Sequence, residues 1–375
     1  MSQPIPFIDL QAQRRRLGAP LEAAIQKAVE GGQWILGPQV AQFERDIAQW
    51  AGVKHAIACA NGTDALLLVL RAWGVGPGDA VFVPAFTFAA SAEVVALAGA
   101  VPVFVDVLPD TFNIDPVSLD AAIALVKKHG ALEPKAVMPV DLFGQPADYR
   151  SLTPIARREG LKLLCDTAQG FGGAIDGKRT GSIGDAAATS FFPAKPLGCY
   201  GDGGACFTND DALKDKLLSL RMHGQGSDRY EHVAIGLNSR LDTIQAAILI
   251  EKLKIFEDEI ETRNAIARRY NEAFAGSNRI KTPPVIEGAL SSWAQYTLQV
   301  ANRSEFQLEL KQAGIPTMVY YPIPLSRQPA YAHYPGVPTP VSEALSGQVV
   351  SLPMHPYLDE TTQDRIITAA LKAAG

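Results

Sequence analysis

The feature that most constrains the fold of this 375-residue chain is a series of short apolar runs separated by segments of helical periodicity. The runs lie at residues 55–60, 80–84, 101–107, 136–141, 161–166 and 186–192. Their apolarity is continuous rather than alternating, which is typical of parallel strands covered by helices on both faces. The pattern predicts an α/β fold with a doubly wound, mostly parallel sheet, in which ligands bind outside the carboxyl ends of the strands.

A long helical segment follows in the second half of the chain. From Asp242 to about Ala275, apolar residues recur at the spacing of one buried helical stripe. Beyond it, strand and helix patterns are mixed, and the chain ends with a helical stretch from about Thr361 to Ala374. We predict a large domain over residues 1–250 and a smaller C-terminal α/β domain over residues 251–375, linked by the long helix.

Lys195 carries the strongest chemical signal. It follows the apolar pair Phe191-Phe192 and precedes the glycine-rich stretch 198–204. Apolar neighbours would lower the pKa of the lysine and favour its neutral, nucleophilic amine. Asp166 ends an earlier apolar run and offers a carboxylate there, although taken alone it would also suit a turn at a strand end. A lysine that forms a Schiff base with an aldehyde and a carboxylate that keeps a ring nitrogen protonated are what pyridoxal phosphate (PLP) requires.

A second motif, Asn61-Gly62-Thr63-Asp64, lies between the apolar run that ends near Cys59 and a helical run from Ala65 to Trp73. Free backbone N–H groups and a hydroxyl at a helix N-terminus bind phosphate well. The same residues would also serve as an ordinary helix N-cap. Taken alone, the motif leaves both interpretations open.

Together, these motifs carry a resemblance to a known family. The segments concerned are 190–209, 61–65, Asp166 with Gln169, and 236–242. In this order they are typical of the DegT/DnrJ/EryC1/StrS sugar aminotransferases, and the chain resembles that family from Phe7 to Pro356. The resemblance implies the aspartate aminotransferase-like fold type I of PLP-dependent transferases. It also implies PLP as the cofactor, with pyridoxamine phosphate (PMP) formed during turnover.

The resemblance further assigns roles to residues in the first two thirds of the chain. Lys195 and Asp166 would be the catalytic residues as well as cofactor contacts. Phe88 would stack on the cofactor ring, although an isolated phenylalanine is more often part of a core. Gln169 would lie near the ring oxygen. The cofactor phosphate would be held by Gly62, Thr63, Asp64 and Ser190.

Two further groups of residues are assigned through the resemblance alone. The loop with Asn238 and Arg240 would reach the active site of a neighbouring subunit, where Asn238 binds phosphate and Arg240 meets an anionic donor or substrate group. This implies a homodimer with shared active sites; otherwise these residues belong to an ordinary polar loop. Tyr320 and Tyr321 would contact the substrate.

Within the family, the chain looks most like enzymes that aminate oxidised UDP-N-acetylglucosamine derivatives. The implied reaction transfers an amino group from L-glutamate to a UDP-linked 2-acetamido-3-oxo sugar, for cell-surface polysaccharide or lipopolysaccharide. A 4-oxo nucleotide sugar is the alternative substrate. A PLP-dependent sugar dehydratase, whose family members replace the lysine with histidine, and a PLP-binding regulatory protein are the other functions considered.

The sugar's C6 substituent is open at this stage. The uronate enzymes of the family would be expected to show His-Tyr-Pro where this chain has Tyr320-Tyr321-Pro322. A histidine can be cationic and hold a carboxylate, whereas a tyrosine offers a neutral hydroxyl near pH 7. Charged hydrogen bonds are the stronger ones. The substitution therefore favours a neutral hexose slightly over a uronate.

Other classes of function are disfavoured. The formal net charge of −5 and the lack of a long basic cluster argue against nucleic acid. No apolar run approaches the ~20 residues that span a bilayer, and no signal peptide is recognisable, so we expect a cytoplasmic protein with no membrane partner. The histidines lack the spacing of metal ligands, so we predict no metal site. The glycines at 74–78 flank a proline and follow a helix, which argues against a dinucleotide site.

Overall fold

The computed structural model describes residues 4–228 and 230–375. The α-helices are α1 (Leu10–Glu30), α2 (Pro38–Ala51), α3 (Gly62–Ala72), α4 (Ala90–Leu97), α5 (Pro116–His129), α6 (Tyr149–Glu159), α7 (Asp211–Leu220), α8 (Thr243–Phe274), α9 (Arg303–Gln312), α10 (Pro340–Gln348) and α11 (Glu360–Ala374). The principal strands are β1 (His55–Cys59), β2 (Asp79–Pro84), β3 (Val101–Val105), β4 (Glu133–Val137), β5 (Lys162–Asp166), β8 (Ala186–Ser190), β9 (Gly204–Thr208), β10 (Ile280–Lys281), β12 (Tyr296–Val300) and β13 (Val349–Leu352). Short strands β6 (Ala174–Ile175), β7 (Lys178–Arg179) and β11 (Ala289–Leu290) form a separate small sheet.

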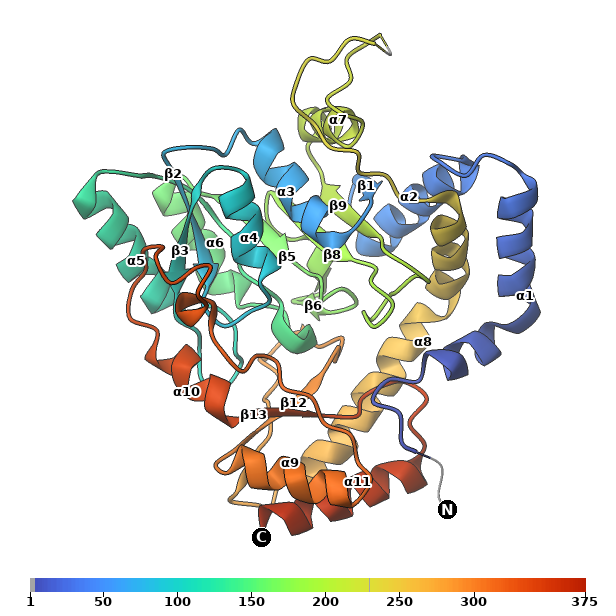
Figure 1. Cartoon of the computed structure of the whole chain (residues 1–375), viewed down its shortest axis with the longest axis vertical. Coiled ribbons are helices and arrows are strands. Elements are labelled where there is room, and N and C mark those ends of the chain that lie inside the picture. Colours follow the sequence, from blue (N-terminus) through green and yellow to red (C-terminus); the bar gives the residue numbers. More distant parts are fainter. Residues whose placement is uncertain (1–3, 229) are drawn as a thin grey trace.

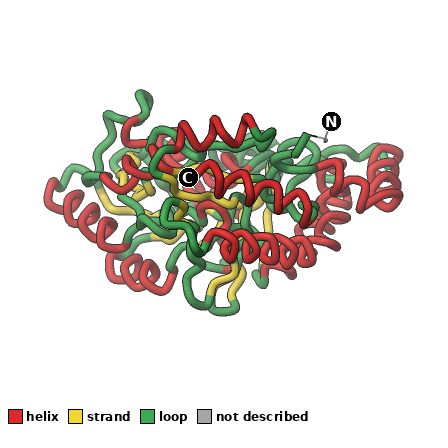
Figure 2. The backbone as a smooth tube through the Cα atoms, turned by 90° about the horizontal axis from the view of Figure 1, so that it is seen from below, coloured by secondary structure: helices red, strands yellow, loops and turns green. Residues whose placement is uncertain are grey.

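A seven-stranded sheet forms the centre of the large domain, in the order β1-β9-β8-β5-β4-β2-β3. All neighbouring pairs are parallel except those of β9, which runs antiparallel to β1 and β8. Helices cover both faces, as Figures 1 and 2 show from two directions. Alternate residues of β1 point into two different apolar clusters, Ala56 into one and Ile57 into the other. Burial on both faces explains the continuous apolar runs, and the predicted mostly parallel sheet is confirmed.

Strand β9 is not among the strands that the apolar runs predict. It follows β8 in the chain, and the loop between them, residues 191–203, carries Lys195. Its five residues come directly after a glycine-rich stretch, so their own pattern is weak. Pairing with β1 on one side and β8 on the other places β9 inside the sheet. The strand therefore fixes both ends of the lysine loop.

Helix α8 is the long helix expected from Asp242 to about Ala275, and it runs from Thr243 to Phe274. Figure 1 shows it extending from beside α2 in the large domain to the small domain below. It packs against both α1 and α2. The boundary predicted at residue 250 lies within this helix, and the division into two domains there stays a prediction.

The predicted small domain, called the small domain below, contains an antiparallel three-stranded sheet in the order β10-β12-β13. Helices α9 and α11 pack together beside it. Its apolar cluster includes Tyr296 and Leu352 from the sheet, Ile366 from α11, and Ile5 from the start of the described chain. No helix in residues 4–228 or 230–375 is both long and apolar enough to cross a membrane.

Candidate active site

A pocket of about 460 Å³ lies at the carboxyl ends of the central strands. Residues that follow β1, β2, β5 and β8 form most of its wall, and Gln295, Tyr320 and Tyr321 complete it from the later part of the chain. Nine residues of the predicted site line this pocket: Gly62, Thr63, Phe88, Asp166, Gln169, Ser190, Lys195, Tyr320 and Tyr321. Residues far apart in the sequence thus converge where a doubly wound sheet places ligands.

The half-buried Lys195 and the buried Asp166 form a pair of opposite charge in this pocket. Removal from water lowers the pKa of Lys195, and the nearby Asp166 carboxylate opposes that shift. Desolvation likewise raises the pKa of Asp166, while the Ala168 N–H, the Lys195 charge and the Ser91 hydroxyl lower it. The Lys195 amine has no hydrogen-bond partner within the described residues, so it is free to react with a group in the pocket.

The Asp166 carboxylate is oriented by hydrogen bonds to both oxygens. Its Oδ1 accepts from the Ala168 N–H at 3.1 Å, and its Oδ2 accepts from the Ser91 hydroxyl at 3.1 Å. Ser91 in turn lies 3.3 Å from the Thr87 hydroxyl. Each carboxylate oxygen can accept a further bond, so Asp166 retains acceptor capacity for a protonated ring nitrogen.

The loop that carries Lys195 is held by hydrogen bonds of its own backbone. The Lys195 N–H donates to the Phe192 carbonyl at 2.8 Å, and the Cys199 N–H donates to the Phe191 carbonyl at 2.8 Å. A Cβ atom at Gly198 would lie 2.5 Å from the Pro193 carbonyl oxygen, so the turn admits only glycine there. The tight turn places the lysine at a defined point of the pocket wall.

The N-terminus of α3 forms the opposite end of the pocket. The Asn61 side chain caps the helix by accepting the Asp64 N–H at 2.8 Å, which satisfies the N-cap alternative. The N–H groups of Gly62 and Thr63 find no acceptor among the described residues. A Cβ atom at Gly62 would lie 2.6 Å from the Ser190 Cβ, so close approach of these two segments requires glycine. The free N–H groups of Gly62 and Thr63 and the hydroxyls of Thr63 and Ser190 thus lie at the same end of the pocket, which fits a phosphate.

Gln169, Tyr321 and Phe88 line the wall between these two ends. The Gln169 Oε1 accepts from the Phe143 N–H at 2.7 Å, and its Nε2 donates to the Tyr321 hydroxyl at 3.0 Å. The second Nε2 hydrogen remains available to a ligand oxygen. Phe88 is 56% exposed, and its ring centroid lies 6.2 Å from that of Tyr321. An exposed aromatic face beside the Lys195–Asp166 pair fits a planar ring, so the pocket matches PLP at both ends.

Three predicted site residues do not line the pocket: Asp64, Asn238 and Arg240. Asp64 lies in the first turn of α3, directly after Gly62 and Thr63. Ser239, which separates the other two, is fully buried, and its hydroxyl accepts the Ala60 N–H at 3.2 Å. The side chains on either side of it are more exposed than Ser239. Within one chain, Asn238 and Arg240 are therefore not brought together with Lys195.

Several pocket residues could not be recognised from the sequence. Gln295 and Asp202 line the pocket, and Ser91 contacts Asp166 from α4. The Gln295 Oε1 is buried and has no hydrogen-bond partner among the described residues. Asp202 lies in a motif that was recognised for its glycines. Ser91, a serine four residues after Thr87 at the start of a helix, gave no signal without the position of Asp166.

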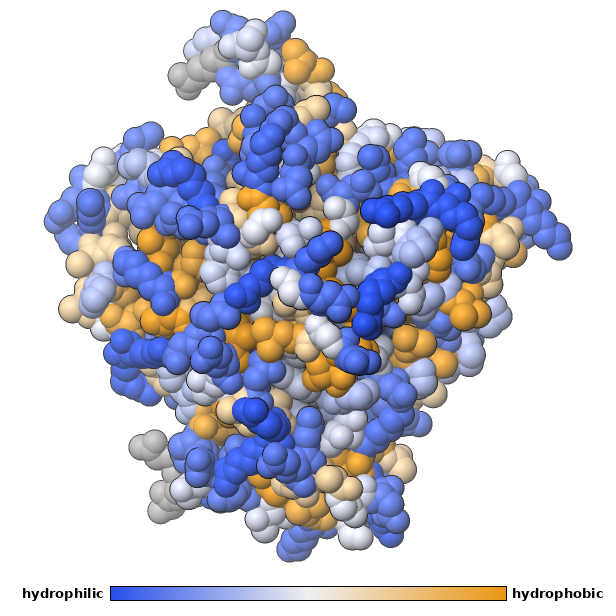
Figure 3. Space-filling view, turned by 180° about the vertical axis from the view of Figure 1, so that it is seen from behind, coloured by the Kyte–Doolittle hydropathy of each residue, from blue (hydrophilic) through white to orange (hydrophobic). Residues whose placement is uncertain are grey.

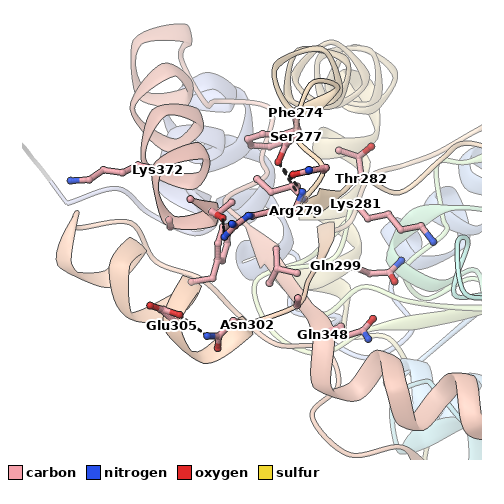
Figure 4. A pocket seen from close by; sticks show the side chains of 18 of the residues that line it. Phe274, Ser277, Arg279, Lys281, Thr282, Gln299, Asn302, Glu305, Gln348 and Lys372 are labelled. Carbon is pink, nitrogen blue, oxygen red and sulfur yellow. Dashed lines mark hydrogen bonds between the residues drawn. The ribbon is translucent and has the colours of Figure 1, made fainter.

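A second hollow, of about 830 Å³, lies among elements of the small domain (Figure 4). It is open and lined by the ends of α8, α9 and α11 together with β10 and β12. Two of its cations already have partners: Arg279 donates to the Ala374 carbonyl at 3.2 Å, and Lys281 pairs with Asp110. It does not include Lys195 or Asp166. The chemistry expected from the sequence is confined to the smaller pocket.

Comparison with known proteins identifies the family. Residues 16–371 match the DegT/DnrJ/EryC1/StrS aminotransferase family. The chain is 49% identical, over 98% of its length and 99% of the other, to the UDP-2-acetamido-2-deoxy-3-oxo-D-glucuronate aminotransferase of Pseudomonas aeruginosa. It is 40% identical, over 97% and 96%, to the UDP-N-acetyl-3-dehydro-alpha-D-glucosamine 3-aminotransferase of Acidithiobacillus ferrooxidans. The protein belongs to the DegT/DnrJ/EryC1/StrS aminotransferase family.

Solved structures agree with this assignment. A DegT/DnrJ/EryC1/StrS aminotransferase from Brucella abortus superposes with a TM-score of 0.97 at 55% identity, covering 99% of this chain and all of the other. The NtdA protein of Bacillus subtilis, solved with its cofactor PMP bound, gives a TM-score of 0.90 at 28% identity, covering 100% of this chain and 86% of the other. The predicted fold of PLP-dependent aminotransferases is thereby confirmed.

Proposed function

We propose that this aminotransferase uses PLP to move an amino group from L-glutamate to a UDP-linked 2-acetamido-3-oxo sugar. The product would be a 3-amino sugar nucleotide of the kind used for cell-surface polysaccharide or lipopolysaccharide. The proposal rests on one observation. Lys195, Asp166 and the residues with free N–H groups at the start of α3 all line the same pocket. A dehydratase with histidine in place of the lysine would not present this amine.

Each pocket residue then has a defined task. When bound, PLP supplies an electron sink for the charge left on the donor's α-carbon and carries the amino group between substrates. Lys195 would hold the cofactor through its aldehyde and, once released, would accept the proton that leaves the donor's Cα. Asp166 keeps the ring nitrogen protonated, because its carboxylate stabilises the positive charge. Gly62, Thr63 and Ser190 bind the phosphate, and Phe88 stacks on the ring.

The position of the ketone is proposed from the relatives. The names of the Pseudomonas and Acidithiobacillus enzymes both specify a 3-oxo or 3-dehydro sugar on UDP, with an acetamido or N-acetyl group. The C6 substituent differs between these two enzymes. Higher identity to the glucuronate enzyme favours a uronate, whereas Tyr320, whose hydroxyl is neutral near pH 7, favours the hexose. We therefore propose the 3-oxo class as a whole and compare both members of it.

Product analysis tests this function. The purified protein, loaded with PLP, is incubated with L-glutamate and a matched panel of 3-oxo hexose, 3-oxo uronate and 4-oxo UDP-sugars. Mass spectrometry should detect 2-oxoglutarate and an amino sugar nucleotide from a 3-oxo substrate. A 4-oxo sugar with the highest kcat/KM would refute the substrate class. A uronate preference that persisted in Tyr320→Phe would assign carboxylate recognition to another residue, such as Arg240.

We also propose a homodimer with shared active sites. Residues 222–228 and 230–238 stand clear of the body beside α7 in Figure 1 and lie in the lobe at the top of Figure 3. It exposes apolar side chains, including Val233 at 65% and Ile235 at 86%. Exposed apolar groups on a projecting segment favour burial against a second copy. Such a copy would receive Asn238 and Arg240 in its pocket.

Complementation between two inactive variants tests the shared site. Lys195→Ala and Asn238→Ala are mixed under conditions that allow subunit exchange. In a hybrid dimer, one site would contain neither substitution, so roughly a quarter of wild-type activity should return after random mixing. Mass spectrometry of the intact dimers provides the control for exchange. Proven hybrids without activity, or a fully active monomer, would contradict the shared site.

A further inference from the structure

Lys252 is a buried cation that the proposed reaction does not use. It lies on α8, and only 1% of its surface is exposed. Its Nζ donates to the Gly198 carbonyl at 2.5 Å and lies 4.4 Å from the centroid of the Tyr200 ring. Gly198 and Tyr200 both belong to the loop, residues 191–203, that carries Lys195. Lys252 is therefore joined to the backbone three residues beyond Lys195.

A lysine at this position is unfavourable for packing alone. Desolvation lowers the pKa of Lys252 to about 8, although the nearby Glu259 carboxylate and Cys199 thiol oppose the shift. A buried cation with few partners costs stability, and replacement by an apolar side chain of similar size is often neutral or stabilising. A methionine would fill the same space without that cost. The amine must then contribute something that an apolar side chain cannot, which is the charged hydrogen bond to Gly198.

Helix α8 holds the same loop at a second point. The Gln245 Oε1 accepts the Tyr200 N–H at 2.8 Å. Gln245 and Lys252 are seven residues apart, which places them on the same face of the helix, two turns from each other. The helix thus binds one carbonyl and one N–H of the loop, at Gly198 and Tyr200.

The geometry of the loop connects this attachment to Lys195. The Lys195 N–H closes a turn onto Phe192, and the Cys199 N–H closes the wider turn onto Phe191. The space around Gly198 is too small even for a Cβ atom. The turn is closed by these two backbone hydrogen bonds and has no free space at Gly198. A shift of the Gly198 peptide must therefore also move its neighbours, including Lys195.

From these contacts we propose that Lys252 is a positioning residue, whose ammonium group fixes the loop at Gly198 and so sets the place of the Lys195 amine in the pocket. The proposal rests on the assignment of Lys195 as the cofactor lysine. It assigns to α8 a direct part in preparing the active site. Lys252 itself touches neither cofactor nor substrate.

Lys252→Met tests the proposal, because it keeps the length of the side chain and removes the donor and the charge. Misplacement of a reacting group by about 1 Å costs on the order of 100-fold, so kcat should fall by roughly 10- to 100-fold. KM for the sugar should change little, since no sugar-binding residue is altered. The matched control is Lys254→Met, on the same helix, where the lysine is exposed and pairs with Glu251. This control should keep the wild-type kcat.

A second measurement does not depend on turnover. Apo-protein is mixed with PLP and reduced with borohydride at short times, and the labelled lysine is identified by peptide mass spectrometry. Wild type and Lys254→Met should be labelled at Lys195, and Lys252→Met should be labelled there several-fold more slowly. Failure of the wild type to be labelled at Lys195 would refute the proposed function itself, independently of Lys252.

Thermal unfolding separates positioning from a purely structural role. We expect the unfolding midpoint of Lys252→Met to equal or exceed that of the wild type, together with the lower kcat and slower labelling. Unchanged kcat and labelling would overturn the proposal. The proposal would also be overturned if Lys252→Met had a lower midpoint and its activity fell only in proportion to the loss of folded protein. In that case kcat per folded molecule would equal the wild-type value. Gln245→Leu, which removes the second attachment, should slow labelling in the same direction.

Discussion

Ionisable side chains removed from water have different surroundings in the pocket and in the packed interior of the protein. In the pocket, Lys195 and Asp166 influence each other's pKa, and both face a cavity that a ligand can enter. In the interior, Lys252 and Asp141 are also buried, but each is turned towards protein groups and neither lines the pocket. Burial shifts the pKa of all four side chains. A shifted pKa therefore identifies a reactive group here only when a cavity adjoins it.

The largest effect is expected for Lys195→Ala. Loss of the amine removes both the attachment point and the proton carrier, and a positioned acid–base group contributes up to roughly 10⁴-fold. We expect kcat to fall by at least that factor in a steady-state assay of 2-oxoglutarate formation. Lys254→Ala, which alters an exposed lysine, serves as the control. Repeated turnover near the wild-type rate would remove Lys195 from the site.

Asp141→Asn should alter stability and leave kcat nearly unchanged. Desolvation raises the pKa of Asp141 from 3.8 to about 8, against hydrogen bonds to Oδ1 from Tyr149 and the Ala147 N–H. Because the folded protein binds this proton more tightly than the unfolded chain, wild-type stability falls as pH rises from about 4 to 8. A neutral asparagine does not cause this fall in stability with pH. Asp141→Asn should therefore be more stable than the wild type at pH 8, by up to about 5 kcal/mol.

Urea denaturation at pH 5 and pH 8 checks this expectation. The stability difference between Asp141→Asn and the wild type should be small at pH 5 and larger at pH 8. A difference that is constant with pH would mean that Asp141 titrates normally. A large loss of kcat would place Asp141 with the pocket residues and so break the comparison.

Asp166→Asn makes the same substitution at the aspartate that lines the pocket. The amide removes the charge that stabilises a protonated ring nitrogen, and loss of one such electrostatic contact costs roughly 10²- to 10³-fold in kcat. Stopped-flow measurement of the half-reaction with L-glutamate gives the rate directly. If both aspartates tolerated asparagine equally well, the distinction between pocket and interior carboxylates would fail.

The smallest effect concerns Lys252 and pH. Its pKa in the folded protein, about 8, is below the ordinary value of 10.5. The unfolded chain binds this proton more tightly, so Lys252 should make the wild type gain stability as pH rises from about 8 to 10.5, by about 3 kcal/mol. Lys252→Met should lack this gain and be the more stable protein at pH 7. Parallel stability–pH curves for the two proteins would show that the lysine is not desolvated.

Much of the fold could be predicted because each strand is buried on both faces. The run predicted at 55–60 is β1, His55–Cys59. The run at 136–141 was placed too late, since β4 is Glu133–Val137. Beyond Val137, pairing with β5 continues only as an isolated parallel bridge between Val140 and Asp166. Strand β9 depends on pairing at both edges, and a local pattern does not contain that information.

The same division applies to the site. Residues next to a strand end or a helix start, such as Gly62, Asp166 and Lys195, could be recognised because their local segments have a recognisable chemistry. Ser91 and Lys252 could not. A serine near the start of a helix and a lysine in an amphipathic helix are usually solvent-exposed. Their contacts with Asp166 and Gly198 exist only once distant segments have packed.

The position of Ile5 has a consequence for how the protein is made. Ile5 shares an apolar cluster with Ile366 of α11, so one small core contains residues from near both ends of the chain. During synthesis, Ile5 leaves the ribosome long before Ile366 exists. The central sheet can form while this core is still incomplete, and contacts between such distant residues close late. Until then, the apolar residues of the small domain lack part of their cover. Chaperones that bind exposed apolar segments would therefore have access to these residues until Ile366 has been made and packed.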